Sequence, residues 1–332
     1  MRKGILAGGN LIMDYVKIID CWPSEGMLAN IEREGKNPGG APHNVLVDLA
    51  KFDVDMPLFA VGLCGDDEVG EEILHIFNSN NIDTTYIQQT SLEPTSYTEV
   101  MTVKASGNRT FFHCRGANKL LCAEHFQNIE TNAKIFHLGY LLLLDKLDEL
   151  DSEYGVVAAK VLANMRKKGY KTSVDVVSED SDRYQKIVVP CLKYTDYLII
   201  NEVEAGRITN VNVRSEQNKI NLSNLETVAQ KLLDGGVGEL VVIHFPEGAI
   251  ALEKNGKMQY VPSFKIETSA IKGTVGAGDA FCAGVLYGIH ENLSIEKSLK
   301  IGHASAYFNL QSPTSTGCAA SLKIIQEFVE QY

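Results

Sequence analysis

The chain has 332 residues, of which 45% are hydrophobic and 22% charged, a composition that is typical of a globular protein and excludes wholesale disorder. Its 31 Lys and Arg against 42 Asp and Glu give a formal charge of −11, which argues against a protein that binds nucleic acid mainly by neutralising phosphates. The longest strongly apolar run, residues 135–144, is about half as long as a membrane-spanning helix. We therefore expect a cytoplasmic protein without a nucleic acid or membrane partner.

In the first half of the chain, short apolar segments alternate with segments of helical periodicity. Strands are expected at residues 4–9, 16–21 and 57–62, and helices at 41–52 and 68–77. Residues 97–103 and 110–114 alternate with period 2 on either side of Ser106-Gly107-Asn108, and this pattern predicts a β-hairpin.

The second half repeats a strand followed by a helix more regularly. Strands are expected at residues 135–144, 172–177, 197–200 and 240–243, and helices at 152–168, 223–233, 277–290, 295–310 and 322–331. Ser223 and Glu226 form a plausible capping box for the second of these helices. Asn255-Gly256 predicts the turn of a hairpin that follows the strand at 240–243.

This alternation predicts an α/β fold with a mainly parallel central sheet and helices on both faces. Two segments fall outside the rhythm, at about residues 12–36 and 93–115, and they are expected to form a small β-strand lid over one end of the sheet. No linker rich in Pro, Gly or Ser is visible, so we expect residues 1–332 to form a single domain with the lid inserted in it.

The sharpest motif is the glycine-rich turn at residues 273–281, which runs directly into a predicted helix. Such a turn presents free backbone N–H groups at a helix N-terminus, where they favour an anion such as phosphate. It is not a Walker A loop, because no Lys-Ser/Thr follows the glycines. Asp279 places a carboxylate beside this cradle, a position that suits a base taking the proton from a group that attacks a phosphate. Alone, Asp279 is equally well explained as a first-turn acid favoured by the helix dipole.

Three further polar groups lie near the ends of predicted strands. Asp14 follows the first strand, and Gly39-Gly40 opens a helix that carries Asn44, so these residues can hold hydroxyl groups. Asn201 and Glu204 follow the strand at 197–200, at the sheet edge where ligands bind in open α/β folds.

Together and in this order, these motifs resemble those of the ribokinase-like (PfkB-type) carbohydrate kinase family over essentially the whole chain. The family's Asp-Thr-x-Gly-Ala-Gly-Asp signature is matched from Thr274 to Asp279. Its Gly-Gly-x-x-x-Asn signature is matched by Gly39, Gly40 and Asn44, and its Asn-x-x-Glu motif by Asn201 and Glu204.

The resemblance implies a ribokinase-like fold and transfer of the ATP γ-phosphoryl group to a hydroxyl of a small sugar or sugar derivative, with Mg2+. It implies that Asp279 is the base and that the N–H groups of Gly276, Ala277 and Gly278 form the anion hole. The residues implied to hold the sugar are Asp14, Gly39, Gly40 and Asn44. Those implied to serve ATP and magnesium are Thr274, Asn201 and Glu204, the last through a water molecule.

Two departures from the family pattern concern the nucleotide side. Gly273 replaces the usual Asp, a position linked to a monovalent cation, so we expect little activation by potassium. Residues 244–248, from His244 to Gly248, replace the Thr-x-Gly-x-x-Gly stretch that normally lines the nucleotide site. The resemblance therefore places His244 and Gly248 near ATP but leaves the preferred phosphoryl donor open.

Arg109 and Arg115 flank the predicted lid strand at 110–114 and either contact an anionic substrate or are solvated charges at a strand edge. The open edges of a small lid also predict a homodimer joined through the lid. A nucleoside kinase of the same fold stays open as an alternative, and so does a catalytically silent binding or regulatory protein.

Overall fold

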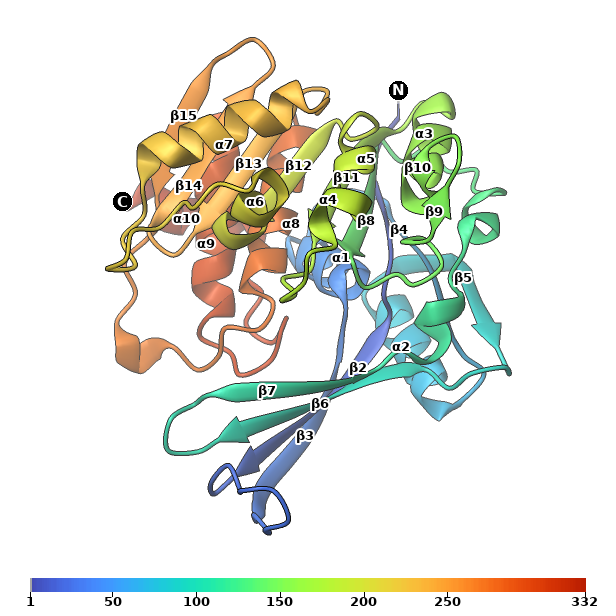
Figure 1. The fold of residues 1–332 in the computed structure, drawn as a ribbon, viewed down its shortest axis with the longest axis vertical. Helices are drawn as coiled ribbons and strands as arrows, with labels where there is room; N and C mark the ends of the chain where they lie inside the picture. Colours follow the sequence, from blue (N-terminus) through green and yellow to red (C-terminus); the bar gives the residue numbers. More distant parts are fainter. Residues whose placement is uncertain (1) are drawn as a thin grey trace.

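The computed structural model describes residues 2–332 and shows an α/β body from which a smaller β-sheet projects (Figure 1). Within these residues, nine strands form the sheet of the body: β1 (Ile5–Gly8), β4 (Leu58–Gly65), β5 (Ile82–Thr90), β8 (Ile135–Leu141), β11 (Lys171–Val176), β12 (Tyr197–Asn201), β13 (Leu240–Phe245), β14 (Gly248–Glu253) and β15 (Met258–Pro262). Their order is β15-β14-β13-β12-β11-β8-β1-β4-β5. The strands from β13 to β5 pair in parallel, whereas β14 and β15 add an antiparallel hairpin at one edge.

Helices cover both faces of this sheet. One face carries α1 (Ala41–Lys51), α2 (Glu68–Ser79), α8 (Ala277–His290), α9 (Ile295–Asn309) and α10 (Leu322–Glu330). The other face carries α3 (Val157–Lys167), α4 (Tyr184–Ile187), α5 (Val189–Leu192), α6 (Glu202–Thr209) and α7 (Leu222–Asp234). Alternate residues of each strand enter opposite cores: in β1, Ile5 and Ala7 pack against one layer and Leu6 against the other. Parallel strands buried on both faces need this continuous apolar sequence.

The projecting sheet, called the lid sheet here, consists of β2 (Ile12–Ile19), β3 (Ile31–Gly39), β6 (Ser96–Val103) and β7 (Arg109–Cys114). Its order is β3-β2-β6-β7, with the central pair parallel and both outer pairs antiparallel. Figure 1 shows the lid sheet reaching away from the body, with β7 on the side of the body. The predicted fold class is therefore confirmed, including the small second sheet, while the extent of a single domain over 1–332 stays a prediction.

The remaining elements are short. They are β9 (Leu150–Asp151), β10 (Gly155–Val156) and the 3-10 turns η1 (Gly116–Leu120), η2 (Ala123–Phe126) and η3 (Thr268–Ala270). Among residues 2–332, no helix combines the length and the apolar content that crossing a bilayer requires.

Several boundaries differ from the sequence prediction. Helix α3 starts at Val157 instead of residue 152, because the preceding residues form the β9–β10 ribbon. The N-cap of α7 is Asn221, whose side chain accepts a hydrogen bond from Asn224 N at 3.1 Å, so the Ser223 capping box is wrong. Strand β5 was missed because an edge strand with many polar residues lacks a sustained apolar pattern.

Candidate active site

A cavity of about 760 Å³ lies where the strands of the body end, under the tip of the lid sheet. Its lining includes residues from three parts of the chain: Gly107, Asn108, Arg109 and Phe111 of the lid sheet, Tyr140, Asp175, Asn201, Glu204 and His244 at or just after strand ends, and residues 271–276, Gly278 and Asp279 at the start of α8. This is the carboxyl edge of parallel strands, where open α/β sheets bind ligands.

The loop before α8 forms an anion cradle. Gly276 caps the helix with φ 79° and no side-chain cap, and the backbone N–H groups of Gly276, Gly278 and Asp279 have no partner among residues 2–332. A Cβ on Gly276 would lie 2.6 Å from the carbonyl oxygen of Ser315, so both conformation and space require glycine there. Ala277 N makes only a long contact of 3.5 Å to Thr274 O. Free amides at a helix N-terminus favour phosphate.

Asp279 lies in the first turn of α8 and is 6% exposed. Its Oδ2 accepts hydrogen bonds from Asn44 Nδ2 at 2.7 Å and from the Tyr140 hydroxyl at 3.0 Å. Its Oδ1 has no side-chain hydrogen-bond partner in the described part of the chain. Burial raises the pKa of Asp279 to about 6, while both hydrogen bonds act against that rise. At neutral pH the group is mostly a carboxylate, as a base must be.

Two of the residues predicted to hold the sugar, Asn44 and Asp14, lie near Asp279. Gly40 caps α1 with φ 90°, and a Cβ there would collide with the carbonyl of Asn10. Asn44 follows on α1 and reaches Asp279, and Asp14 on β2 packs against Gly39, whose Cβ would lie 2.6 Å from Asp14 Oδ2. Burial raises the pKa of Asp14 to about 6, and its charge in turn raises that of Asp279.

The lid sheet is polar beside Asp14. Asp14, Thr98 and His113 are register partners across β2, β6 and β7, and Thr98 Oγ1 lies 3.0 Å from His113 Nδ1. The lining of the cavity does not include Asp14, Gly39, Gly40 or Asn44.

Asn201 and Glu204 form the capping box of α6. Asn201 Oδ1 accepts from Glu204 N at 2.9 Å, and Glu204 Oε2 accepts from Asn201 N at 2.9 Å. Glu204 Oε1 also accepts from Asn201 Nδ2 and from Ser178 Oγ, each at 2.7 Å. Burial raises the pKa of Glu204 to about 7. The motif therefore starts a helix as well as lining the cavity.

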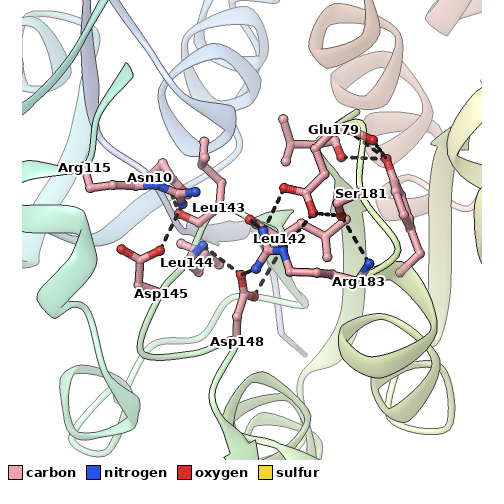
Figure 2. Close-up of polar contacts among 12 residues, drawn as sticks. Asn10, Arg115, Leu142, Leu143, Leu144, Asp145, Asp148, Glu179, Ser181 and Arg183 are labelled. Carbon is pink, nitrogen blue, oxygen red and sulfur yellow. Dashed lines mark hydrogen bonds and ion pairs between the residues drawn. The ribbon is translucent and has the colours of Figure 1, made fainter. Parts of the chain in front are cut away.

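The two arginines lie in different places. Arg109 begins β7 and lines the cavity, and its Nη1 is buried without a hydrogen-bond partner in residues 2–332. A Cβ on Gly273 would lie 3.1 Å from Arg109 Nη2, so this guanidinium lies against the loop that leads into the anion cradle. Arg115 instead lies 3.0 Å from Asp145 and outside the cavity lining (Figure 2).

Three of the residues that the resemblance places near the nucleotide differ in whether they line the cavity. Thr274 and His244 line the cavity, and burial lowers the pKa of His244 to about 4, so its ring is neutral. Gly248 is not among the lining residues. It pairs with Phe245 in the β13–β14 hairpin, where a Cβ would lie 2.7 Å from Val261 O.

Sequence reasoning missed three residues beside Asp279. Asp175, on β11, accepts from Tyr140 N at 2.6 Å, and burial raises its pKa. Asp48 lies one turn after Asn44 on α1, and both its oxygens are buried without a partner among the described residues. Asp175 could have been found by its place near the end of a predicted strand. Tyr140 lies inside an apolar run, and Asp48 inside a helix, where no signal marks them.

The comparisons identify the family. Residues 6–322 match the pfkB family carbohydrate kinases, so the chain belongs to that family. A probable fructokinase-7 of Arabidopsis thaliana is 26% identical over 306 residues, which are 89% of this chain and 81% of the relative. A ribokinase of Haemophilus influenzae is 24% identical over 331 residues, which are 99% of this chain and 98% of the relative.

Solved structures support the same fold. The structure of Arabidopsis thaliana ribokinase complexed with ribose and ATP superposes with a TM-score of 0.78 at 22% identity, covering 99% of both chains. Membership of this family of carbohydrate kinases makes the chain a phosphotransferase. The predicted family and enzyme class are confirmed.

Proposed function

We propose that this chain transfers the γ-phosphoryl group of ATP to a hydroxyl of a small sugar or sugar derivative, with Asp279 as the base. The observation that carries the proposal is the pairing of two features in one turn of α8. Asp279 has one oxygen held by two donors and one without a side-chain partner, and the neighbouring N–H groups of Gly276 and Gly278 are unpaired within residues 2–332.

The chemistry follows from that pairing. The acceptor hydroxyl gives its proton to Asp279 Oδ1 while its oxygen forms a bond to the γ-phosphorus. The bond from that phosphorus to the bridging oxygen breaks, and ADP leaves. Phosphoryl transfer depends mainly on positioning and on stabilising negative charge. The unpaired amides of Gly276 and Gly278 supply this stabilisation without reorganising.

The donor set on the cavity wall suits Mg2+. Asp175 and Glu204 offer hard oxygen ligands, although the described residues contain no cluster of three acidic, His or Cys side chains placed to hold a metal ion. Mg2+ commonly keeps several waters and binds through one or two carboxylates and the phosphates of the substrate. Glu204 would hold it through water, because both its carboxylate oxygens already accept hydrogen bonds. The ion would neutralise negative charge on the phosphates.

Arg109 is better placed for the phosphoryl group than for the sugar. Its guanidinium lies against Gly273, and a side chain at this position would also meet Ser312 O, 2.6 Å from the Cβ. The acidic residue usual in the family therefore has no space here. We assign to Arg109 positive charge beside the cradle, and we expect little dependence on a monovalent cation.

Two observations bear on the acceptor. The row of Asp14, Thr98 and His113 gives the lid sheet a polar strip, which favours the hydroxyls of a sugar. Phe111 on the cavity wall is the observation that favours the alternative, a nucleoside, because its ring offers a surface for a base. The unpaired amides and the base argue against a catalytically silent protein.

A homodimer joined through the lid sheet remains part of the proposal. Trp22 stacks on Phe112 with ring centroids 6.2 Å apart, and both rings are about half exposed, as is Ile31 on the edge strand β3. Leu28, in the loop between β2 and β3, is 81% exposed. An apolar patch beside open strand edges is a surface that a second copy would cover.

The test is ATP consumption by the purified chain with a panel of hexoses, pentoses, keto-deoxy sugar acids and nucleosides, each with and without Mg2+. Phosphate transfer to a sugar or sugar acid, lost in the Asp14→Ala variant, supports the proposal. Turnover with nucleosides alone supports the alternative, and binding of a sugar without turnover at any Mg2+ concentration supports a silent protein.

A further inference from the structure

The two oxygens of Asp279 are in different environments. Oδ2 accepts from Asn44 at 2.7 Å and from the Tyr140 hydroxyl at 3.0 Å, whereas Oδ1 has no side-chain partner in residues 2–332. The carboxylate therefore cannot rotate freely, because rotation would break two hydrogen bonds to a charged group. This asymmetry aims Oδ1 into the space that a substrate hydroxyl would enter.

Tyr140 is held in a conformation that non-glycine residues seldom adopt. Its φ is 60°, and Leu142, two residues later, has a φ of 80°. Such backbone conformations are strained and persist only where the surrounding structure enforces them. At Tyr140 the enforcing contact is the 2.6 Å hydrogen bond from its N–H to Asp175 Oδ1.

The segment that follows Tyr140 is fixed by a polar network (Figure 2). Asp148 accepts from the N–H groups of Leu142 and Leu144, each at 3.3 Å. Arg183 lies 3.5 Å from Asp148 Oδ2 and donates to Leu142 O.

Asn10 binds the same segment from the end of β1, donating to Leu143 O at 2.9 Å. Together these contacts anchor the segment that follows Tyr140 at the end of β8.

We propose that Tyr140 is a positioning residue, whose phenol holds Oδ2 of Asp279 so that Oδ1 faces the acceptor hydroxyl. The proposal rests on the assignment of Asp279 as the base. It goes beyond that assignment because Tyr140 belongs to none of the motifs, and its hydroxyl donates to Asp279 Oδ2, through which it would act on the reacting hydroxyl.

The phenol has two effects that can be measured separately. It fixes the direction of the carboxylate, so its loss lowers the rate of proton transfer at all pH values. It also stabilises the charged form of Asp279, so its loss raises the pH at which the base becomes protonated. A residue that only supports the fold would produce neither effect once the protein is folded.

The experiment compares Tyr140→Phe with the parent enzyme and with Tyr184→Phe as a matched control. Tyr184 also bonds through its hydroxyl near this loop, to Val177 O and Glu179 O, but it does not touch Asp279. We measure kcat and KM for the best acceptor between pH 5 and 9, with circular dichroism to verify folding. Tyr140→Phe should lower kcat about tenfold, leave the KM for the acceptor within about twofold and move the acid limb of the kcat profile up by about one pH unit. Tyr184→Phe should change neither.

Two results would overturn the proposal. One is a kcat and a pH profile for Tyr140→Phe that match the parent enzyme. The other is a lower KM with an undiminished kcat, which would show that the phenol occupies the place of the substrate and must be displaced. The Asp279→Asn variant separates the role of Asp279 from the role of Tyr140. If Asp279→Asn keeps its turnover, the assignment of the base is wrong. If it is inactive while Tyr140→Phe behaves like the parent enzyme, only the role of Tyr140 is wrong.

Discussion

Replacing Asp279 with Asn should make the protein more stable while it removes catalysis. The pKa of the carboxyl is about 6 in the folded protein against 3.8 in the reference state, and burial is the main cause. A difference of about two pKa units corresponds to about 3 kcal/mol. Because neighbouring carboxyl groups share the effect, we expect Asp279→Asn to raise the free energy of unfolding by about 1–3 kcal/mol. Asn has nearly the same shape, and its amide oxygen can accept the two bonds from Asn44 and Tyr140.

The sign of the pH dependence follows from the raised pKa. Well below pH 4 the carboxyl is protonated in both the folded and the unfolded state, so its burial does not lower the stability. As the pH rises from about 4 to 6, the unfolded state loses its proton first, so the native protein becomes less stable relative to it. Above about pH 6 the native protein bears the full loss of stability that comes from burying the charged carboxylate. The gain in stability from Asp279→Asn should therefore be small at pH 4, grow between pH 4 and 6, and be close to its full size at pH 8.

The measurement is urea unfolding of both proteins at pH 4, 5, 6 and 8, together with kcat at pH 8. We expect kcat to fall about 10²–10⁴-fold, the usual range for a lost general base. Asp196→Asn is the matched control: Asp196 is also buried, but it lies 3.1 Å from Arg166 and accepts from Thr172 N at 2.8 Å, so its replacement should destabilise the protein. The reasoning fails if Asp279→Asn is less stable than the parent at pH 8, or if it keeps more than about a tenth of the parent kcat.

Three other predictions use the same assays. Arg109→Ala should lower kcat/KM for ATP at least tenfold, while the KM for the sugar changes less than twofold. Arg33→Ala, on the far strand of the lid sheet, should change neither value. An equal loss for ATP and for sugar would show that Arg109 does not lie beside the phosphoryl group. Because Gly273 carries no carboxylate, potassium titrated from zero at constant ionic strength should raise kcat/KM by less than fivefold, and a larger rise would show that an ion site exists without it. Light scattering should give a dimer mass at high micromolar concentration, reduced to a monomer mass in Trp22→Lys with Phe112→Lys; a monomer in the parent chain would refute lid pairing.

The sequence predicted the layers of the fold well because burial on two faces imposes a simple pattern. Strands such as β12 and β13 are continuous apolar runs, and the helices between them show periodic apolar positions. Boundaries were less predictable where side chains decide the local structure. Asn221 caps α7 in place of Ser223, and the β9–β10 ribbon displaces the start of α3, because several residues in each region can serve as caps.

The candidate site was predictable where it depends on the backbone. Glycines at positions 40 and 276 adopt positive φ in tight contacts, so the residue type itself reveals the turn. The partners of the base were not predictable, because they meet only in three dimensions. Tyr140 and Asp175 are far from Asp279 in the sequence and reach it because parallel strands end at one edge. Asn44 is predicted to hold substrate, and the structure adds a contact that the sequence did not predict, from its amide nitrogen to Asp279 Oδ2.

The charged groups that line the cavity bear on how a nucleotide would bind there. Its described lining carries the carboxyl groups of Asp175, Glu204 and Asp279, while the cationic side chains there are Arg109 and Lys272. Burial raises the pKa of all three carboxyl groups, so they keep their protons to a higher pH than an exposed acid would. An anionic nucleotide would be repelled from such a wall without cations of its own, and Mg2+ brought with ATP would both offset that repulsion and favour the charged carboxylates. We therefore expect cations near the phosphates, from Mg2+ and from Arg109, to favour the ionised form of Asp279 that the proposed reaction requires.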